Sequence, residues 1–293
     1  MTEGIIVKGI GGFYYVKTKA DTYTCKAKGS FRKENKTPYV GDKVEIRIVN
    51  EETKEGFIEE IKERTNFLIR PPVSNIDRMI IISAVAEPEP DTVFIDKMIA
   101  ICEHNNIEPV LCFNKIDLKA DLSIISDYEK IGYKVMKTSV KDGVGLCELK
   151  NMLINGITSV AGFSGVGKSS LLSTAINKQL ETGKVSDKIS RGKHTTRHVE
   201  LFEVEEGKFF ADTPGFSSLD FENIEIILKE NLQFCFPEFE KYIGQCKFVS
   251  CAHIGEKGCR ICEAVKNGEI PESRHESYKM MYDEVKDYKE WEH

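Results

Sequence analysis

The segment formed by residues 162–169, with the sequence Gly-Phe-Ser-Gly-Val-Gly-Lys-Ser, restricts the fold of this chain more than any other feature. The pattern, in which a glycine is followed after four residues by Gly-Lys-Ser, is typical of a loop between a strand and a helix. Residues 158–161 before it can form a short strand, and a helical pattern begins near residues 169–172. The segment therefore predicts an α/β domain built on a parallel sheet.

The residue types of this segment suit a phosphate chain. Glycines let backbone N–H groups approach an anion closely, and the start of the following helix faces the same anion. Lys168 would neutralise the outer phosphates, and the Ser169 hydroxyl would bind Mg²⁺. A glycine-rich turn without a ligand is the alternative. The predicted phosphate-binding residues are Gly162, Phe163, Ser164, Gly165, Val166, Gly167, Lys168, Ser169 and Ser170.

A second motif, Asn-Lys-Ile-Asp at residues 114–117, indicates which base the nucleotide carries. The Asp117 carboxylate can accept two hydrogen bonds from guanine N1 and N2, whereas adenine offers no such pair of donors. Lys115 would lie along the base, and Asn114 would tie the loop to its neighbours. Alone the motif could be a polar turn, but beside a phosphate loop it predicts GTP or GDP as the ligand.

The order of the two motifs is reversed relative to an ordinary GTPase, in which the phosphate loop comes first. Each motif still follows an apolar strand pattern, so we expect a complete site in a circularly permuted chain. The apolar run 79–86 predicts a strand buried on both faces, and Asp91 can cap the helix that follows it. Together these segments indicate a doubly wound α/β sheet.

Three further residues are expected around the nucleotide. Ser139, which lies in the segment 138–140, would support the base through main-chain amides. Asp212 follows the strand pattern 208–211 and would hold Mg²⁺ through water. The amide of Gly215 would meet the γ-phosphate.

The polar segment 190–197 is expected to be ordered by the γ-phosphate and Mg²⁺, with Thr196 or Thr195 as the second hydroxyl ligand. Phe216 stands where Ras-type enzymes have a water-orienting glutamine. Because an apolar ring cannot orient water, hydrolysis by the chain alone should be slow. His194 is the candidate catalytic replacement, since imidazole can accept a hydrogen bond from water near neutral pH. Packing or a partner contact is the alternative role for His194.

Residues 1–66 are predicted to form a small separate domain. Five short strands in about sixty residues suggest a closed barrel of the oligonucleotide-binding type. The region carries 13 basic and 11 acidic residues, so its charge alone does not predict RNA binding, and packing against a neighbour is the alternative. The adjacent prolines Pro71 and Pro72 should stop regular structure and mark a domain joint. The strand patterns cover residues 5–7, 13–16, 22–25, 43–49 and 56–58.

Five of the nine cysteines fall within residues 235–262. Four residues there form a C-x4-C-x-H-x5-C pattern that matches a closed tetrahedral Zn²⁺ site. Cys262 competes as a ligand, because it has the commoner two-residue spacing from the cysteine before it; reduced, uninvolved cysteines are the alternative. Helical patterns at residues 225–232 and 273–291 flank the cluster. The predicted zinc ligands are Cys246, Cys251, His253 and Cys259.

The composition, with 41% hydrophobic and 30% charged residues, predicts a soluble globular protein. No apolar stretch is long enough to span a membrane, and no signal-peptide pattern opens the chain. We therefore expect a cytoplasmic protein, in which the cysteines do not form a disulfide framework.

Taken together, these residues resemble one family, the ribosome small-subunit-dependent GTPase A family of circularly permuted GTPases. The resemblance runs nearly end to end and includes the barrel, the joint, the motif order, the segment 192–196 and the cysteine cluster. It implies an RNA-facing barrel at residues 1–66, a GTPase domain at 67–220 and a zinc-binding domain at 221–293 that holds one Zn²⁺ on the four ligands. One departure is Lys257, where the family usually has proline.

The resemblance also implies a function. GTP hydrolysis would be slow alone and stimulated by the small ribosomal subunit, the protein would act in late maturation of that subunit, and His194 would be the hydrolysis residue. The expected partners are the small subunit and its rRNA, bound by a monomer. Two alternatives remain, namely an RNA-binding assembly scaffold with a structural nucleotide, and a phosphate-loop kinase or ATPase that would bind ADP as well as GDP.

Overall fold

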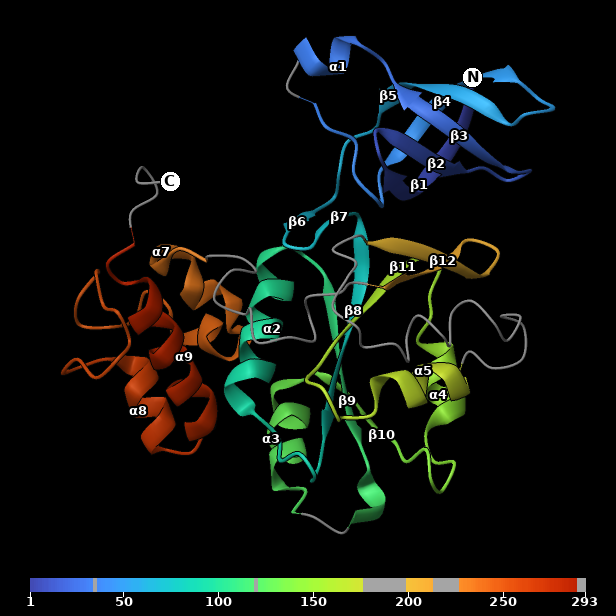
Figure 1. The fold of residues 1–293 in the computed structure, drawn as a ribbon. Coiled ribbons are helices and arrows are strands. Elements are labelled where there is room, and N and C mark those ends of the chain that lie inside the picture. The colour runs from blue at the N-terminus through green and yellow to red at the C-terminus, as the bar shows by residue number, and fades with distance from the viewer. Residues whose placement is uncertain (34–35, 119–120, 176–198, 213–226, 289–293) are drawn as a thin grey trace. The chain divides into compact units, whose positions relative to one another are not determined.

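The computed structural model describes residues 1–33, 36–118, 121–175, 199–212 and 227–288 (Figure 1). The chain forms two compact units and passes between them more than once. Unit one comprises Met1–Ile80, Leu146–Ser164 and Lys168–Glu225. Unit two comprises Ile81–Gly145, Gly165–Gly167 and Ile226–His293. Among the described residues, no helix is both long and apolar enough to cross a membrane.

Unit one begins with a closed five-stranded barrel, which confirms all five predicted strands. The strands pair in the order β1-β2-β3-β5-β4, and β4 pairs back with β1 to close the barrel. Strands β3 and β5 are parallel, and the other pairs are antiparallel. The barrel consists of β1 (Thr2–Ile10), β2 (Phe13–Lys17), β3 (Thr22–Ala27), the short helix α1 (Ser30–Lys33), β4 (Lys43–Asn50) and β5 (Glu55–Ile61).

Alternation along the strands divides the barrel into a core and an outer face. Val44 and Ile46 of β4 point inward and are buried, whereas Lys43 and Arg47 point outward and are exposed. This is the period-two pattern of a strand with one solvated face. Ile48, predicted on the inner side, is only half-buried, because the register of β4 against β5 shifts between Ile48 and Asn50.

The predicted joint contains a small hairpin, of β6 (Phe67–Ile69) and β7 (Pro72–Ser74). The expectation that the two prolines would stop regular structure was therefore wrong for Pro72. It is the first residue of its strand, a position that proline tolerates.

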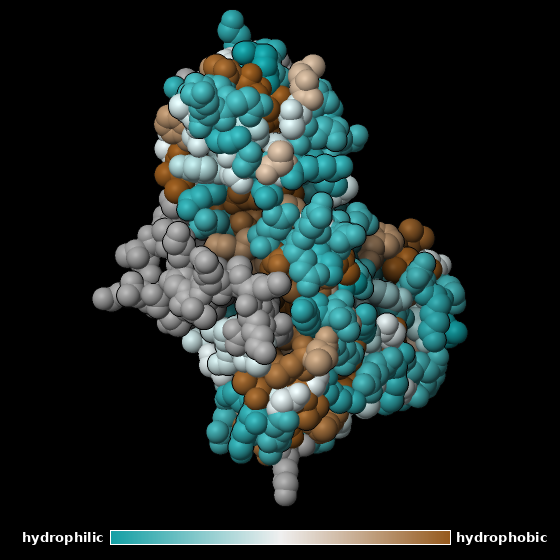
Figure 2. Space-filling model, turned by 90° about the vertical axis from the view of Figure 1, so that its right-hand side faces the viewer, coloured by the Kyte–Doolittle hydropathy of each residue, from teal (hydrophilic) through white to brown (hydrophobic). Residues whose placement is uncertain are grey.

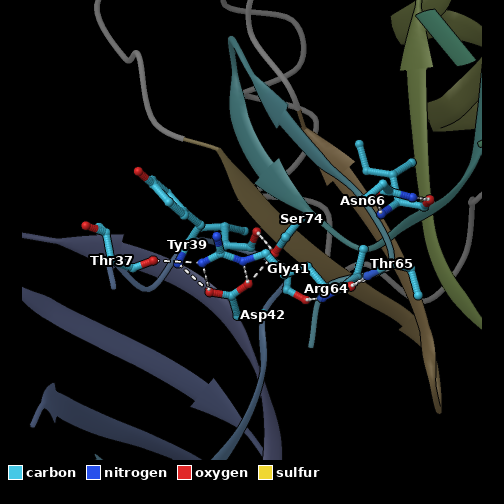
Figure 3. Close-up of polar contacts among 11 residues, drawn as sticks. Thr37, Tyr39, Gly41, Asp42, Arg64, Thr65, Asn66 and Ser74 are labelled. Atoms are coloured by element: carbon cyan, nitrogen blue, oxygen red, sulfur yellow. Dashed lines mark hydrogen bonds and ion pairs between the residues drawn. The ribbon is translucent and has the colours of Figure 1, made fainter. Parts of the chain in front are cut away.

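A buried carboxylate fixes the barrel loop to this hairpin (Figure 3). Asp42, which is fully buried, accepts hydrogen bonds from Arg64 Nε at 2.7 Å, from Arg64 Nη2 at 2.8 Å and from Ser74 Oγ at 2.7 Å. Gly41 has φ +94°, and a Cβ there would lie 2.0 Å from the Ser74 carbonyl oxygen, so only glycine fits. Because the Asp42 carboxylate accepts hydrogen bonds from the charged Arg64 and the polar Ser74, its buried oxygen atoms are all paired.

The remainder of unit one is an α/β layer. Strand β11 (Gly156–Ala161) runs parallel to β13 (Lys208–Asp212), and β12 (Glu200–Glu205) pairs antiparallel with β13. Strand β12 also pairs with β1 of the barrel. Two ion pairs, Lys8–Glu200 and Lys17–Glu203, each of 3.0 Å, connect the barrel to β12. Helices α4 (Leu146–Asn151) and α5 (Lys168–Ala175) complete the layer. Its described core includes Leu153, Leu172 and Phe210.

Unit two contains the strands β10 (Lys134–Lys137), β9 (Glu108–Asn114) and the end of β8 (Ile76–Ala84), in that order. Strands β9 and β10 are parallel. Helix α2 (Thr92–His104) begins as predicted, because the Asp91 side chain accepts a hydrogen bond from the Phe94 N–H at 2.9 Å. Also in this unit are the 3-10 helix η1 (Ile116–Leu118) and helix α3 (Ser123–Ile131).

The C-terminal part of unit two packs α9 against α2 (Figure 1). Of the helix predicted at residues 225–232, residues 225 and 226 lie outside the described part of the chain, and α7 begins at Lys229 because Leu228 has an extended backbone. Helix α9, predicted to reach residue 291, ends at Val285 within the described residues. Tyr278 and Met281 are buried, as predicted, whereas Tyr282, Val285 and Tyr288 are half-buried. The elements of this part are α7 (Lys229–Leu232), η3 (Gln233–Cys235), η4 (Pro237–Tyr242), α8 (Arg260–Lys266) and α9 (Glu272–Val285).

Candidate nucleotide site and metal centre

The phosphate-loop segment lies between β11 and α5, the strand and helix that its sequence predicts. Lys168, the first residue of α5, donates hydrogen bonds from Nζ to the Gly162 and Phe163 carbonyl oxygens, each at 2.6 Å. Burial lowers the pKa of Lys168 to about 8. Burial therefore disfavours the charged form of this side chain relative to a lysine in water, and an anion bound beside it would favour the charged form again. Ser169 and Ser170 follow in the first turn of α5.

Asn114, at the end of β9, connects the other motif to this loop within unit two. The residue is 2% exposed. Its Nδ2 donates to the Val166 carbonyl oxygen at 2.8 Å, and its Oδ1 accepts from Thr138 Oγ1 at 3.1 Å. Gly167 has φ +94°, and a Cβ there would lie 2.4 Å from Asn114 Nδ2. The close approach of this amide therefore requires glycine at position 167.

Asp117 is held as an ionised acceptor. Its Oδ1 accepts from Ser139 Oγ at 2.8 Å, and Lys141 Nζ lies 3.7 Å from Oδ2. The Ser139 hydrogen bond and, to a smaller extent, the Lys141 charge lower the pKa of Asp117. A carboxylate of this kind accepts hydrogen bonds at neutral pH and donates none.

Ser139 contacts the aspartate of the base-reading motif through its side chain. Its backbone N–H donates to the Val144 carbonyl oxygen at 3.1 Å, and the N–H of Thr138 donates to Phe113 at 2.8 Å. These two amides are paired within the protein. Lys115 has φ +62° and donates from Nζ to the Glu87 carbonyl oxygen.

The contacts above do not include the other residues predicted at the nucleotide site. Asp212 ends β13, with its backbone opposite Glu200. His194, Thr196 and Gly215 lie outside the described residues.

The four predicted zinc ligands come together in unit two. One ligand atom from each of Cys246, Cys251, His253 and Cys259 lies within 4.8 Å of all the others. His253 Nδ1 is 3.6 Å from the Sγ atoms of both Cys246 and Cys259, which are 4.0 Å apart. In a tetrahedral site with Zn–S bonds of about 2.3 Å, sulfur atoms lie about 3.8 Å apart, so this donor set fits Zn²⁺.

Neighbouring groups orient these ligands. Gln233 Oε1 lies 3.0 Å from His253 Nε2, which can donate to it and so leaves Nδ1 free to face a metal. Burial raises the pKa of both Cys251 and Cys259 to about 12, so metal binding there must displace protons. Gln233 was not predicted, because a lone glutamine outside the cysteine spacing carries no recognisable pattern.

Cys262 lies beside this cluster and outside it. Its Sγ is 3.7 Å from the His253 carbonyl oxygen and 4.0 Å from His275 Nε2. Its backbone N–H donates to the Cys259 sulfur at 3.4 Å. The geometry therefore favours Cys259 over Cys262 in the four-ligand set.

A buried arginine attaches the C-terminal part of unit two, which carries the Cys/His cluster, to α2. Arg274 of α9 is 1% exposed, and its Nη1 lies 2.6 Å from Asp96 Oδ1 while its Nε lies 2.7 Å from Glu238 Oε1. Its guanidinium carbon is 4.5 Å from the centroid of the Phe236 ring. Tyr128 also donates to Asp96 Oδ1, at 2.7 Å. Two carboxylates and an aromatic face thus surround one cation.

Comparison with known proteins gives matches to this chain along its length. Residues 61–222 match the family described as RsgA GTPase, and residues 3–58 match the RsgA N-terminal domain. The protein called small ribosomal subunit biogenesis GTPase RsgA in Agathobacter rectalis is 44% identical, over 97% of this chain and 98% of that protein. Its namesake in Caldanaerobacter subterraneus is 46% identical, over 97% of this chain and 96% of that protein.

Solved structures agree with these matches. The crystal structure of YjeQ from Thermotoga maritima aligns with a TM-score of 0.80 at 36% identity, covering 98% of this chain and 99% of that one. The structure of YloQ, a circularly permuted GTPase, aligns with a TM-score of 0.79 at 37% identity, covering 99% of this chain and 96% of that one. The protein therefore belongs to the RsgA GTPase family and has its circularly permuted GTPase fold, with a barrel before it and a helical region carrying the Cys/His cluster after it.

Proposed function

We propose that this GTPase acts in late maturation of the small ribosomal subunit, binds immature subunits in its GTP form and leaves them after hydrolysis. The observation that carries the proposal is the match over nearly the whole chain to relatives named for biogenesis of that subunit. Contact of the barrel with rRNA, a monomeric state and a cytoplasmic location belong to the same proposal. So do the domain boundaries at residues 1–66, 67–220 and 221–293.

The nucleotide would be held by the two motifs described above. Lys168 would turn from the loop carbonyls to the outer phosphates, while backbone amides of residues 162–167 cradle the chain of phosphates. Asp117 would accept from guanine N1 and N2, with Ser139 fixing its orientation. The Asn114–Val166 hydrogen bond supports this role, because it ties the base-reading motif to the phosphate loop.

Hydrolysis would depend on residues near the γ-phosphate. When bound, Mg²⁺ supplies positive charge that offsets the charge of the β- and γ-phosphates. The hydroxyls of Ser169 and Thr196 would hold it directly and Asp212 through water, and the Gly215 amide would meet the γ-phosphate. His194 would orient the attacking water, a function for which Phe216 has no suitable atom.

One Zn²⁺ would be bound by the cluster of three cysteines and one histidine, with Gln233 holding the histidine ring. Its role would be structural, because all four tetrahedral positions would be filled by protein ligands. The polar segments between η4 and α8 would then be stabilised by coordination as well as by burial.

Co-sedimentation with immature small subunits tests the timing of binding. We expect the protein to sediment with subunits in a non-hydrolysable GTP analogue and to be released in GDP. Equal binding in both nucleotides would contradict the proposal. If Lys168→Ala left subunit maturation intact in cells, the protein would act as a scaffold and its turnover would be incidental.

A further inference from the structure

Two cysteines at the start of helix α8 lie beside each other, and only one of them belongs to the four-ligand cluster. Cys259 caps the helix, and its sulfur accepts the backbone N–H of Cys262 at 3.4 Å. Helical geometry places the Cα atoms of residues three apart at about 5 Å, within the range that a disulfide spans. Cys259 and Cys262, which we call the α8 cysteine pair, are therefore arranged as in a Cys-x-x-Cys redox motif.

Contacts other than metal coordination hold Cys262 next to the cluster. Its sulfur lies 3.7 Å from the His253 carbonyl oxygen and 4.0 Å from His275 Nε2. The same Nε2 lies 2.6 Å from that carbonyl oxygen, which can only accept, so the nitrogen carries a proton and donates it there. Cys262 is thus a fifth thiol, fixed beside the four ligands by the backbone of one ligand and by the ring of His275.

The two thiols of the α8 cysteine pair differ in exposure. Cys259 is 1% exposed, whereas Cys262 is half-buried. A small oxidant dissolved in water therefore reaches Cys262 first. Burial raises the pKa of the Cys262 thiol, so only a small fraction is thiolate at neutral pH, and its oxidation is slower than that of a dedicated peroxide-reducing cysteine.

We infer that the α8 cysteine pair is an oxidation site, at which hydrogen peroxide joins Cys259 to Cys262 and so removes Cys259 from the ligand set. In the first step the Cys262 thiolate attacks one peroxide oxygen, the O–O bond breaks, and hydroxide leaves. Cys262 is then a sulfenic acid, oxidised by two electrons, and the peroxide is reduced. In the second step the Cys259 sulfur attacks the Cys262 sulfur, the S–S bond forms and the S–O bond breaks. Hydroxide leaves, and a proton from the Cys259 thiol or from solvent converts it to water.

A disulfide between two members of the four-ligand set is less favourable. Sulfur atoms in a tetrahedral zinc site lie about 3.8 Å apart, and a disulfide needs about 2.05 Å, so two ligand sulfurs can join only after the metal has left. Cys246 and Cys259, for example, have their sulfur atoms 4.0 Å apart. Cys262 lies outside the set and can be oxidised while the site is intact. Loss of Cys259 then leaves Cys246, Cys251 and His253, and with three ligands in place of four the metal should be released.

Zinc release from the full-length, zinc-loaded protein in excess hydrogen peroxide tests the pair. A chromogenic chelator that changes its absorbance on binding zinc follows the release. Cys262→Ser removes the thiol that peroxide reaches first and nearly keeps its size, so release should slow roughly tenfold or more. The zinc content of this variant before oxidation should equal that of the wild type. A dithiol reductant with added zinc should restore the oxidised wild type, because thiols reverse disulfide formation.

The matched control is Cys147→Ser. Helix α4 lies at the right of Figure 1, the side that faces the viewer in Figure 2, and Cys147 of this helix is exposed. Its thiol is open to peroxide but does not belong to the four-ligand cluster. Its loss should therefore leave zinc release unchanged.

Peptide mapping without reduction gives a second readout. Arg260 stands between the two cysteines, so trypsin separates them into the peptides 258–260 and 261–266. Oxidation should join these two peptides by a disulfide, with the loss of two hydrogen atoms from their summed mass. A disulfide that joins Cys259 to Cys246 or Cys251 instead would place the oxidation within the ligand set and overturn the inference.

Other outcomes separate this inference from the proposed function. Zinc release from Cys262→Ser at the wild-type rate would overturn the inference, as would a Cys262→Ser protein that loads no zinc, since Cys262 would then be a ligand. The inference rests on the proposed function only for the zinc, which the metal content of the untreated wild type tests separately. Joined peptides from a wild type that holds no zinc would support the pair and contradict the proposed zinc site. Joined peptides from a protein whose GTP turnover small subunits fail to stimulate would support the pair and contradict the proposed function.

Discussion

Replacing Arg274 by methionine should loosen the C-terminal region from helix α2. Arg274 is surrounded by the carboxylates of Asp96, which is fully buried, and of Glu238, whose side chain is 6% exposed. Methionine retains much of the length and the apolar contact with Phe236, so the substitution removes mainly the charge.

The magnitude follows from the burial of the partners. Removing one member of a buried ion pair costs about 3 to 5 kcal/mol, because the remaining charge is left unpaired. Adding Asp96→Asn and Glu238→Gln to the variant removes both unpaired charges, so the triple variant should regain at least about 2 kcal/mol. Lys97→Met is the matched control. This substitution breaks the ion pair of 2.6 Å between Lys97 of α2 and the half-exposed Glu284 of α9. It should lower the free energy of unfolding by at most about 1 kcal/mol.

Urea unfolding of the zinc-loaded protein, with hydrogen exchange of peptides from α9, measures these differences. We expect Arg274→Met to lower the free energy of unfolding of this region by several kcal/mol and to speed exchange in α9. A loss no larger than that of Lys97→Met would refute the argument that the buried charges hold the region in place.

Three further predictions concern the nucleotide and the metal. Asn114→Ala leaves the buried Val166 carbonyl without its side-chain donor and removes the Asn114 contact of the Thr138 hydroxyl, so GDP should bind roughly 10- to 100-fold more weakly in calorimetry, and unchanged affinity would contradict the linking role. Because burial lowers the pKa of Lys168 to about 8 and phosphate requires the ammonium, GDP binding should take up a proton at alkaline pH. Affinity should then fall roughly fourfold between about pH 7 and about pH 8.5, whereas a flat profile would show that Lys168 is charged throughout. Gln233→Leu should weaken Zn²⁺ binding about 10- to 100-fold in competition with a chromogenic chelator, and an unaffected metal would mean that other groups orient His253.

Local patterns in the sequence were sufficient for much of the fold. Alternation in residues 43–49 and the turns around it predict the barrel strands, because each strand has one buried face. Asp91 marks the start of α2, since a capping side chain acts on backbone only three residues away. The phosphate-loop segment likewise specifies its own strand and helix.

Contacts between distant residues were not predictable in the same way. Asp96 and Arg274 are 178 positions apart, and an arginine in a helical pattern is normally assigned to the solvated face. The neighbouring positions of Lys26 and Phe57 depend on the parallel pairing of β3 with β5, which the order of the strands does not reveal. The short α7 reflects the extended conformation of Leu228, which periodicity cannot show.

The most direct test of the account is the rate of GTP hydrolysis by the purified protein alone, with small ribosomal subunits and with large subunits. We expect slow turnover alone, a large increase with small subunits and no increase with large subunits. Turnover that small subunits leave unchanged would contradict the proposal that this GTPase acts on them.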